Sequence, residues 1–172
     1  MILAIKYWGS KDDLNRKIYL YDTFTGMTNP TKYDYKKNKL TNQENIDRQK
    51  KFQRKDYNLR CYYDIDDLKE YLNIFKYKNL IYLKGDVIDT IPNNNHYQKK
   101  ISFLRLDTDF YVSTKHELDH LYDSVTSGGV IISDDYYTWE GAKKACDEFF
   151  EKIKHKPLYV YTPGSDYVGV KI

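Results

Sequence analysis

The chain has 172 residues, 41% of them hydrophobic, and its 28 basic and 25 acidic residues leave a formal net charge of +3, which is too small to require a nucleic-acid partner. This length suits one domain over residues 1–172 with a sizeable core. Because no apolar run reaches the roughly 18 residues of a membrane span and the first residues lack the basic start of a signal peptide, we expect a soluble, cytoplasmic protein with Cys61 and Cys146 reduced.

The first half of the chain predicts helices and strands in alternation. Two helices and two buried strands are predicted there: helices at residues 1–8 and 64–75, and strands at residues 18–22 and 80–84. The second helix has the clearer signal, because its apolar side chains recur at helical spacing behind an acid-rich start. A short strand is the alternative for the first segment. Residues 89–98, with Pro92 and three asparagines, predict a loop or a ragged helix end.

Residues 28–60 differ from the rest of the chain, because they are dense in lysine and arginine and poor in core residues. We expect this segment to leave the sheet as a basic excursion or flap rather than to form a second domain. A solvated surface is the simplest interpretation of its cations. Cations interleaved with aromatic residues such as Tyr33, Tyr35 and Phe52 also occur in nucleic-acid interfaces, so nucleic-acid binding stays open as a less favoured alternative.

The second half predicts a strand–helix–strand crossover, then a helix and a hairpin. The predicted elements are a strand at residues 103–106, a helix at 113–125, a strand at 130–132, a helix containing residues 142–153, and a hairpin of residues 158–161 and 167–172. Thr114 and Glu117 have the spacing of a capping box, which predicts that the first helix begins there. Gly128 and Gly129 are expected to end the crossover helix segment before the next strand.

Each strand of this crossover is followed by a pair of acids. Asp107 and Asp109 follow the first strand, and Asp134 and Asp135 follow the second. A parallel crossover brings both pairs to the carboxyl edge of one sheet, where open α/β sheets bind their ligands. Carboxylates gathered in this way suit Mg²⁺ or Ca²⁺, and without a cation one of them would have to keep a proton. A turn or helix-cap role is the alternative.

A further acid, Asp22, lies at the tip of the first predicted strand. In nucleotide-binding α/β folds, an acid in such a position often accepts hydrogen bonds from ribose hydroxyls. Aspartate is also a common residue in the turns that end strands. The residue alone does not decide between a ligand contact and a turn.

Taken together, these segments resemble the macrocin O-methyltransferase (TylF-type) family of S-adenosylmethionine-dependent methyltransferases. The resemblance rests on four motifs in order: Ile18-Tyr-Leu-Tyr-Asp-Thr-Phe-Thr-Gly-Met, Lys84-Gly-Asp-Val-Ile-Asp-Thr-Ile-Pro, Leu104-Arg-Leu-Asp-Thr-Asp-Phe-Tyr-Val-Ser-Thr and Gly128-Gly-Val-Ile-Ile-Ser-Asp-Asp-Tyr. It continues through residues 139–149 to the last strand and covers most of residues 18–172. No single motif would be specific, but the combination in this order is.

The resemblance implies an α/β fold with a Rossmann-like class I methyltransferase sheet, mostly parallel and with a C-terminal antiparallel hairpin. It also implies an enzyme that uses S-adenosylmethionine and Mg²⁺ to methylate a hydroxyl, typically on a sugar, so its partner would be a small-molecule or glycan acceptor. The residue roles that it implies are Mg²⁺ ligands at Asp107, Asp134 and Asp135, a general base at Asp109, and cofactor contacts at Asp22, Asp86 and Asp107. Of the cofactor contacts, Asp22 would bind the ribose.

The chain departs from the family pattern at its start. A methyltransferase of this class opens with a strand and a glycine-rich loop, whereas residues 1–17 align better with the helix that follows that loop, as if the domain were N-terminally truncated. The missing strand would lie between the strands that end at Asp22 and Asp107. Either residues 2–5 fill that place, or another chain completes the fold, or the sequence is a remnant of a longer protein. A homo-oligomer and a non-catalytic homologue with an acidic metal- or glycan-binding edge therefore remain alternatives.

Overall fold

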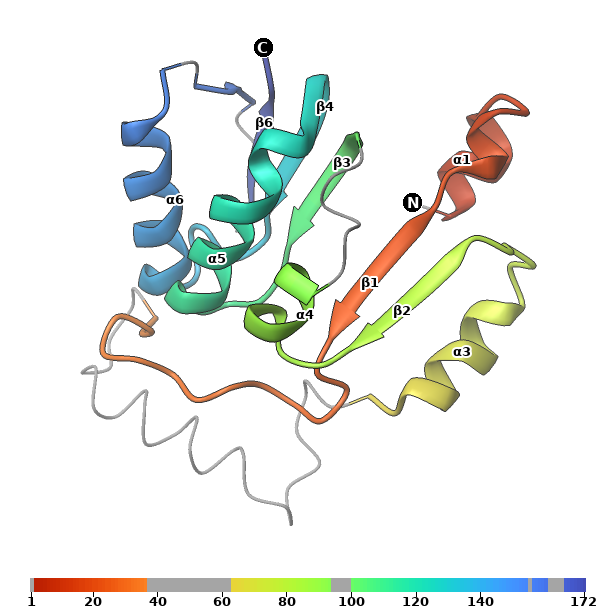
Figure 1. Ribbon diagram of the computed structural model, residues 1–172, viewed down its shortest axis with the longest axis horizontal. Helices are drawn as coiled ribbons and strands as arrows, with labels where there is room; N and C mark the ends of the chain where they lie inside the picture. Colours follow the sequence, from red (N-terminus) through yellow and green to blue (C-terminus); the bar gives the residue numbers. More distant parts are fainter. Residues whose placement is uncertain (1, 37–62, 94–99, 155, 161–165) are drawn as a thin grey trace.

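The computed structural model describes residues 2–36, 63–93, 100–154, 156–160 and 166–172. Figure 1 shows helices and strands alternating along these residues. Their elements are α1 (Ile2–Trp8), η1 (Asp13–Asn15), β1 (Ile18–Asp22), α3 (Ile65–Asn73), β2 (Leu80–Lys84), α4 (Val87–Asn93), β3 (Ile101–Leu106), α5 (Tyr111–Leu121), η3 (Tyr122–Ser124), β4 (Val125–Ser133), α6 (Glu140–Lys152), β5 (Leu158–Val160) and β6 (Tyr167–Val170). None of the helices in this described part is long and apolar enough to cross a membrane.

The described strands form two sheets. The smaller sheet pairs β1 with β2 in parallel, and the larger has the order β3-β4-β6-β5. In the larger sheet β3 and β4 are parallel, whereas β6 runs antiparallel to both of its neighbours. Strands β1 to β4 point the same way, so their carboxyl ends lie at one edge of the molecule (Figure 1). The predicted α/β arrangement, mostly parallel with a C-terminal antiparallel hairpin, is confirmed.

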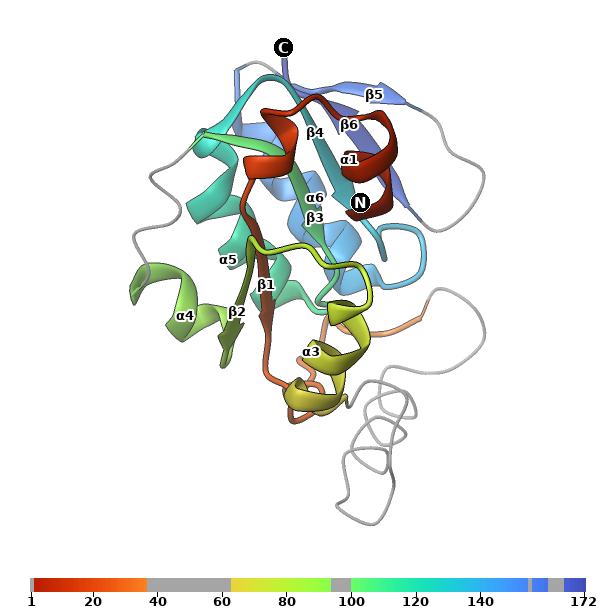
Figure 2. The same ribbon diagram turned by 90° about the vertical axis from the view of Figure 1, so that its right-hand side faces the viewer.

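Helices cover both sides of the strands. Helices α4, α5 and α6 lie on one side, and α1 and α3 lie on the other, as the two views show (Figures 1 and 2). The core lies between the larger sheet and the pair α5 and α6, where Leu118 and Ile131 are 0% exposed. Ala145 and Cys146 of α6 are small and equally buried in this core. Burial of one such aliphatic side chain contributes about 1.5–3 kcal/mol to stability.

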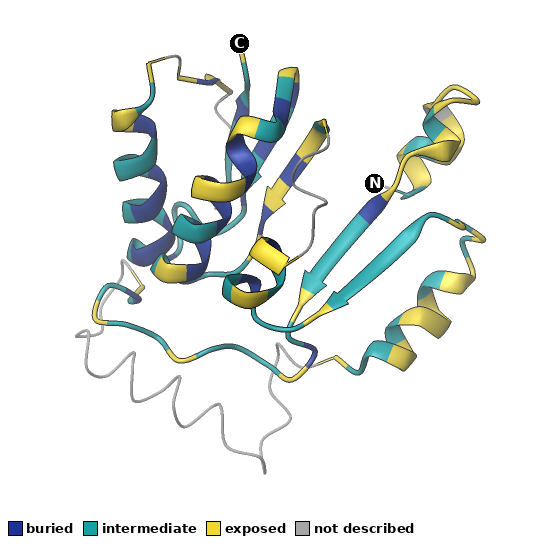
Figure 3. Cartoon of the chain, viewed as in Figure 1, coloured by how far each residue is buried: buried dark blue, intermediate teal, exposed yellow. Residues whose placement is uncertain are grey.

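The boundary between the two sheets falls where the missing strand was expected. Strands β1 and β3 face each other across this boundary, and no ladder of backbone hydrogen bonds joins them in the described part of the chain (Figure 1). Strand β3 is the terminal strand of its sheet at this boundary, because β4 is its partner on the other side. Strand β1 carries little fully buried surface beyond Ile18 (Figure 3). The alternative that residues 2–5 fill the place as a strand is wrong, because they belong to helix α1.

The limits of helix α5 and strand β4 differ most from the prediction. Strand β4 begins at Val125, so Gly128 and Gly129, which were expected to precede the strand, lie inside it. Helix α5 begins at Tyr111 rather than at residue 113, and Glu117 bonds to Thr108 instead of completing a capping box with Thr114. The Tyr111 backbone N–H donates to the Asp34 carboxylate, 77 residues away, at 2.7 Å. A cap from so far along the chain leaves no local sequence signal. The helix ends at Leu121 and a 3₁₀ turn follows, because residue 125 already pairs with Ile101 as the first residue of β4.

The other predicted elements lie close to their expected positions. Both early strands, α1, α3, β3, α6 and the hairpin are confirmed. Residues 89–93 belong to helix α4, which continues through Pro92, and residues 94–98 lie outside the described residues. Of the predicted basic excursion, residues 28–36 are described, and the remaining residues to 60, together with Cys61, lie outside. Cys146 is a buried free thiol, as expected.

Candidate active site

The candidate site lies at the carboxyl ends of β3 and β4. Asp107 and Asp109 follow β3, and Asp134 and Asp135 follow β4, in a turn held to β3 by the Asp134 N–H, which donates to the Leu106 carbonyl at 3.0 Å. The parallel register of the two strands thus brings the two acid pairs together, as the sequence predicted.

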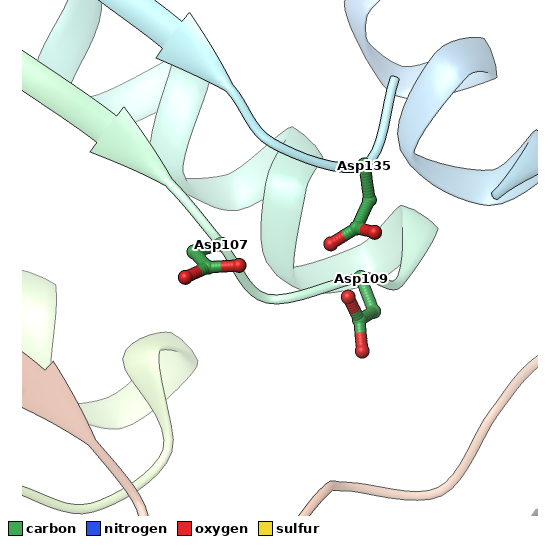
Figure 4. Close-up of side chains that lie close together, drawn as sticks. All are labelled: Asp107, Asp109 and Asp135. Carbon is green, nitrogen blue, oxygen red and sulfur yellow. The ribbon is translucent and has the colours of Figure 1, made fainter. Parts of the chain in front are cut away.

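Three of the four carboxylates form a cluster. One oxygen of each of Asp107, Asp109 and Asp135 lies within 4.8 Å of the others, and the three side chains converge on the same space (Figure 4). Oxygens at such separations can close around one hard cation, because Mg²⁺ and Ca²⁺ bind carboxylates at about 2.0–2.6 Å. The donor set therefore fits Mg²⁺.

A strained turn aims Asp109 into the cluster. Its φ of 60° places it in the left-handed region, which costs a residue with a side chain about 1–2 kcal/mol. The turn is closed by the Phe110 N–H, which donates to the Thr108 carbonyl at 2.6 Å. Backbone strain of this kind concentrates at functional sites. Aspartate and asparagine tolerate the conformation better than most residues.

The electrostatics of the cluster favour a cation. Burial, a hydrogen bond with Asp109 and repulsion from neighbouring acids together raise the pKa of Asp135 to about 8. Burial is also the main cause that raises the pKa of Asp107 to about 6, and the Arg105 guanidinium opposes that rise. Without a cation, the cluster therefore holds at least part of a proton at neutral pH, and a dication would displace it.

Asp134 is turned toward Arg105 instead. The Arg105 guanidinium donates to the Asp134 carboxylate at 2.7 Å and lies 3.1 Å from Asp107. The predicted Mg²⁺ ligands were Asp107, Asp134 and Asp135, whereas the structure groups Asp109 with the first and the last of them. The ligand role of Asp134 and the base role of Asp109 remain predictions. The sequence offered one signal for Arg105, because the two-residue period of a strand places it on the same face as Asp107.

The predicted cofactor acids close local turns at the same sheet edge. Asp22 accepts a hydrogen bond from the Phe24 N–H at 2.6 Å, and Asp86 accepts one from the Ile88 N–H at 3.0 Å, in the first turn of α4. The turn alternative raised for Asp22 is thus realised in the structure. Contacts of Asp22, Asp86 and Asp107 with a cofactor remain predictions.

A buried acid beneath the cluster was assigned the wrong role from the sequence. Glu117 is 6% exposed and accepts a hydrogen bond from the Thr108 hydroxyl at 3.0 Å. Burial raises the pKa of Glu117 to about 8, against the opposing effect of that hydrogen bond. Since Thr108 lies between Asp107 and Asp109, Glu117 fixes the loop that carries both. Its place four residues before the buried Leu121, on the apolar face of α5, was the available signal.

Comparison with known proteins identifies the family. The sequence model of the macrocin-O-methyltransferase (TylF) family matches residues 1–159. The chain belongs to this family. A curated relative, the demethyldecarbamoylnovobiocin O-methyltransferase of Streptomyces niveus, is 38% identical over 72 residues, which are 42% of this chain and 27% of that protein.

Solved structures show the same fold. The O-methyltransferase NovP superposes with a TM-score of 0.70 at 20% identity, over 91% of this chain and 60% of that chain. The calicheamicin methyltransferase CalS11 superposes with a TM-score of 0.70 at 20% identity, over 98% of this chain and 64% of that chain. The predicted methyltransferase fold is therefore confirmed, and the chain spans less than two thirds of either solved relative.

Proposed function

We propose that this TylF-family chain is an S-adenosylmethionine-dependent, Mg²⁺-dependent O-methyltransferase that acts on a sugar or related hydroxyl. The observation that carries the proposal is the convergence of Asp107, Asp109 and Asp135 at the carboxyl edge of the sheet. The sugar as acceptor is supported by a structural relative at 19% identity, described as a TDP-rhamnose 3'-O-methyltransferase.

The residues divide the work of deprotonating the acceptor. Asp107 and Asp135 would hold Mg²⁺, and Asp134 would join them only by giving up its ion pair with Arg105. When bound, the ion would lower the pKa of a chelated hydroxyl. Asp109 would accept the hydroxyl proton on its carboxylate, because it lies in the same cluster and its strained turn fixes its direction. Glu117 keeps the loop in place through Thr108.

Methyl transfer then requires a second reactant held in line with the acceptor oxygen. S-adenosylmethionine would supply the methyl group. Asp22 and Asp86, at the same edge as the cluster, would orient it, and close placement of the two reactants would supply much of the acceleration. Asp109 would keep the acceptor's proton after the methyl group has moved from the cofactor sulfur to the acceptor oxygen, until solvent removes that proton.

A second candidate is a non-catalytic homologue that keeps the acidic edge and binds a metal or glycan. The boundary between β1 and β3 favours it, because no backbone ladder joins the cofactor-side strand β1 to the acidic edge at β3 in the described residues. The two candidates differ in a single property. The enzyme must bind S-adenosylmethionine, whereas the homologue need bind only the cation or the glycan.

Calorimetric titration separates the candidates. S-adenosylmethionine and S-adenosylhomocysteine are titrated into the protein with and without Mg²⁺, and Mg²⁺ is titrated into wild type, Asp135→Asn and a surface control, Asp66→Asn, whose partner is Lys69 on α3. The enzyme proposal expects binding of both cofactor forms, and weaker Mg²⁺ binding only in Asp135→Asn. Mg²⁺ binding without either cofactor form would favour the second candidate and sink the first for this chain.

A further inference from the structure

A segment far from the acids in sequence lies beside them in space. Residues 31–36, here called the strap, run past the N-terminal ends of α5 and α6 (Figure 1). The Glu140 N–H, at the start of α6, donates to the Tyr35 carbonyl at 2.9 Å. The next strap residue, Lys36, forms an antiparallel bridge with Trp139. The strap is therefore joined to α6 by backbone contacts.

The side chain that fastens the strap is Asp34. It is 0% exposed, and its carboxylate accepts hydrogen bonds from the Thr31 N–H at 2.5 Å, the Thr31 hydroxyl at 2.7 Å and the Tyr111 N–H at 2.7 Å. The last of these groups belongs to the first turn of α5, whose N–H groups have no partner within the helix. The positive end of the helix dipole also favours an anion there. Asp34 therefore ties the strap to α5.

The contact between the Asp34 carboxylate and α5 also depends on Gly141 in α6. A Cβ atom at this position would lie 1.9 Å from the Asp34 Oδ1 atom and 3.0 Å from the Tyr111 backbone nitrogen. Atoms cannot approach so closely, so any side chain at position 141 would displace the carboxylate. The absence of a side chain is what lets Asp34 reach α5 past α6.

The fastened strap places a positive charge near the acid cluster. The Lys36 ammonium lies 4.9 Å from the ring centroid of Trp139. The backbone N–H of Trp139 donates to the backbone carbonyl of Asp135 at 2.9 Å. The charge of Lys36 acts on Asp135, whose pKa it lowers against the larger raising effect of burial. Lys36 is thus the strap's contribution to the electrostatics of the cluster.

We propose that Asp34 is a positioning residue that holds Lys36 beside the acid cluster, and that Lys36 so held weakens the binding of a divalent cation there. The proposal rests on the metal site of the proposed function. Its physical basis is the repulsion between an ammonium and an incoming dication in the partly desolvated surroundings of the cluster. The strap would therefore set how tightly the site holds its ion.

A double-mutant cycle tests this coupling by Mg²⁺ calorimetry. Lys36→Met should tighten Mg²⁺ binding by roughly three- to tenfold, the range expected for one unit charge acting at moderate distance. Gly141→Ala should tighten it similarly, because the displaced strap carries Lys36 away. The double variant should then bind no more tightly than Gly141→Ala alone. Lys69→Met, on α3, is the matched control and should leave the affinity unchanged.

Amide hydrogen exchange measures directly whether Asp34 fastens the strap to α5 and α6. The Tyr111 and Glu140 amides, which donate to the strap, should lose protection in Gly141→Ala and in Asp34→Asn but keep it in Lys36→Met. The proposal would be overturned by additive effects of Lys36→Met and Gly141→Ala on Mg²⁺ affinity. Unchanged amide protection in both Gly141→Ala and Asp34→Asn would overturn it as well. If no variant binds Mg²⁺, the metal site of the proposed function fails and the tuning role with it. The exchange result would still decide whether Asp34 fastens the strap.

Discussion

The Arg105 guanidinium donates to the Asp134 carboxylate at 2.7 Å and so joins β3 to the acidic turn after β4. It also lies 3.1 Å from Asp107. One cation of the chain therefore already neutralises part of the acidic edge. It engages Asp134, the predicted Mg²⁺ ligand that borders the cluster of Asp107, Asp109 and Asp135 through a hydrogen bond with Asp107. A metal ion bound at this edge would compete with Arg105 for these oxygens.

Replacing Arg105 should strengthen metal binding. In Arg105→Gln, Asp134 is released to join the other acids, and we expect Mg²⁺ affinity to rise about tenfold, as for the loss of one nearby positive charge. The measurement is calorimetry at pH 8.5, above the pKa of about 6 of Asp107. Arg16→Gln, which removes the ion pair with Asp13, is the control. An unchanged affinity would mean that Asp134 does not reach the ion.

Metal binding should release protons near neutral pH. Because the pKa of Asp135 is raised to about 8 and that of Asp107 to about 6, a dication must displace protons from the cluster, and its affinity should increase between pH 6 and pH 8. Calorimetry in two buffers with different ionisation enthalpies counts the protons, and we expect about one at pH 7. Asp135→Asn should remove most of this release. Equal heats in both buffers would contradict the assignment.

The buried acid Glu117 should make the metal-free protein less stable as pH rises. Its pKa is raised from 4.5 to about 8, so the folded state binds its proton more tightly than the unfolded state does. The stabilisation is complete below pH 4.5 and is lost as the pH rises toward 8. The glutamine of Glu117→Gln cannot titrate. Between pH 5 and pH 9 the free energy of unfolding of this variant should therefore fall by about 2–4 kcal/mol less than that of the wild type.

Chemical denaturation at the two pH values tests the role of Glu117. The exposed Glu70→Gln on α3 should change stability equally at both values and serves as the control. If Glu117→Gln followed the wild-type pH dependence, Glu117 would not be the titrating group.

Asp109 should matter for turnover more than for metal binding. The amide introduced by Asp109→Asn would keep the left-handed backbone that the turn requires, since asparagine tolerates it as aspartate does. Asp109→Asn should therefore lower turnover about a hundredfold or more, as loss of a general base does, while it weakens Mg²⁺ binding less than Asp135→Asn does. Asp135→Asn should instead weaken Mg²⁺ binding. Activity would be followed with an acceptor found by screening sugars and sugar nucleotides. If Asp109→Asn weakened Mg²⁺ binding as much as Asp135→Asn, Asp109 would be a ligand instead.

Local patterns in the sequence predicted most of the fold, and contacts between distant residues account for what they missed. The strands before Asp22 and Asp107 and the helix after Asp64 follow from periodicity and turn residues, which the sequence shows directly. The start of α5 depends on Asp34, 77 residues away, and the direction of Asp134 depends on Arg105 in another strand. The acids could be named as a group from their strand positions. The sequence could not predict which of these acids cluster and which one pairs with Arg105. Side-chain pairing depends on the register of the two strands, which the sequence does not show.

The boundary between β1 and β3 has a consequence for folding cooperativity. Since no backbone ladder crosses it in the described residues, the β1–β2 pair is coupled to the larger sheet through side chains such as Tyr21, which packs against the core. Separation of the two sheets would break no strand pairing, so the β1–β2 pair can open without unfolding the rest. Its amides should exchange faster than those of Ile131 and its neighbours in β4. A chain that added a strand at this boundary would fuse the two units into one cooperative sheet.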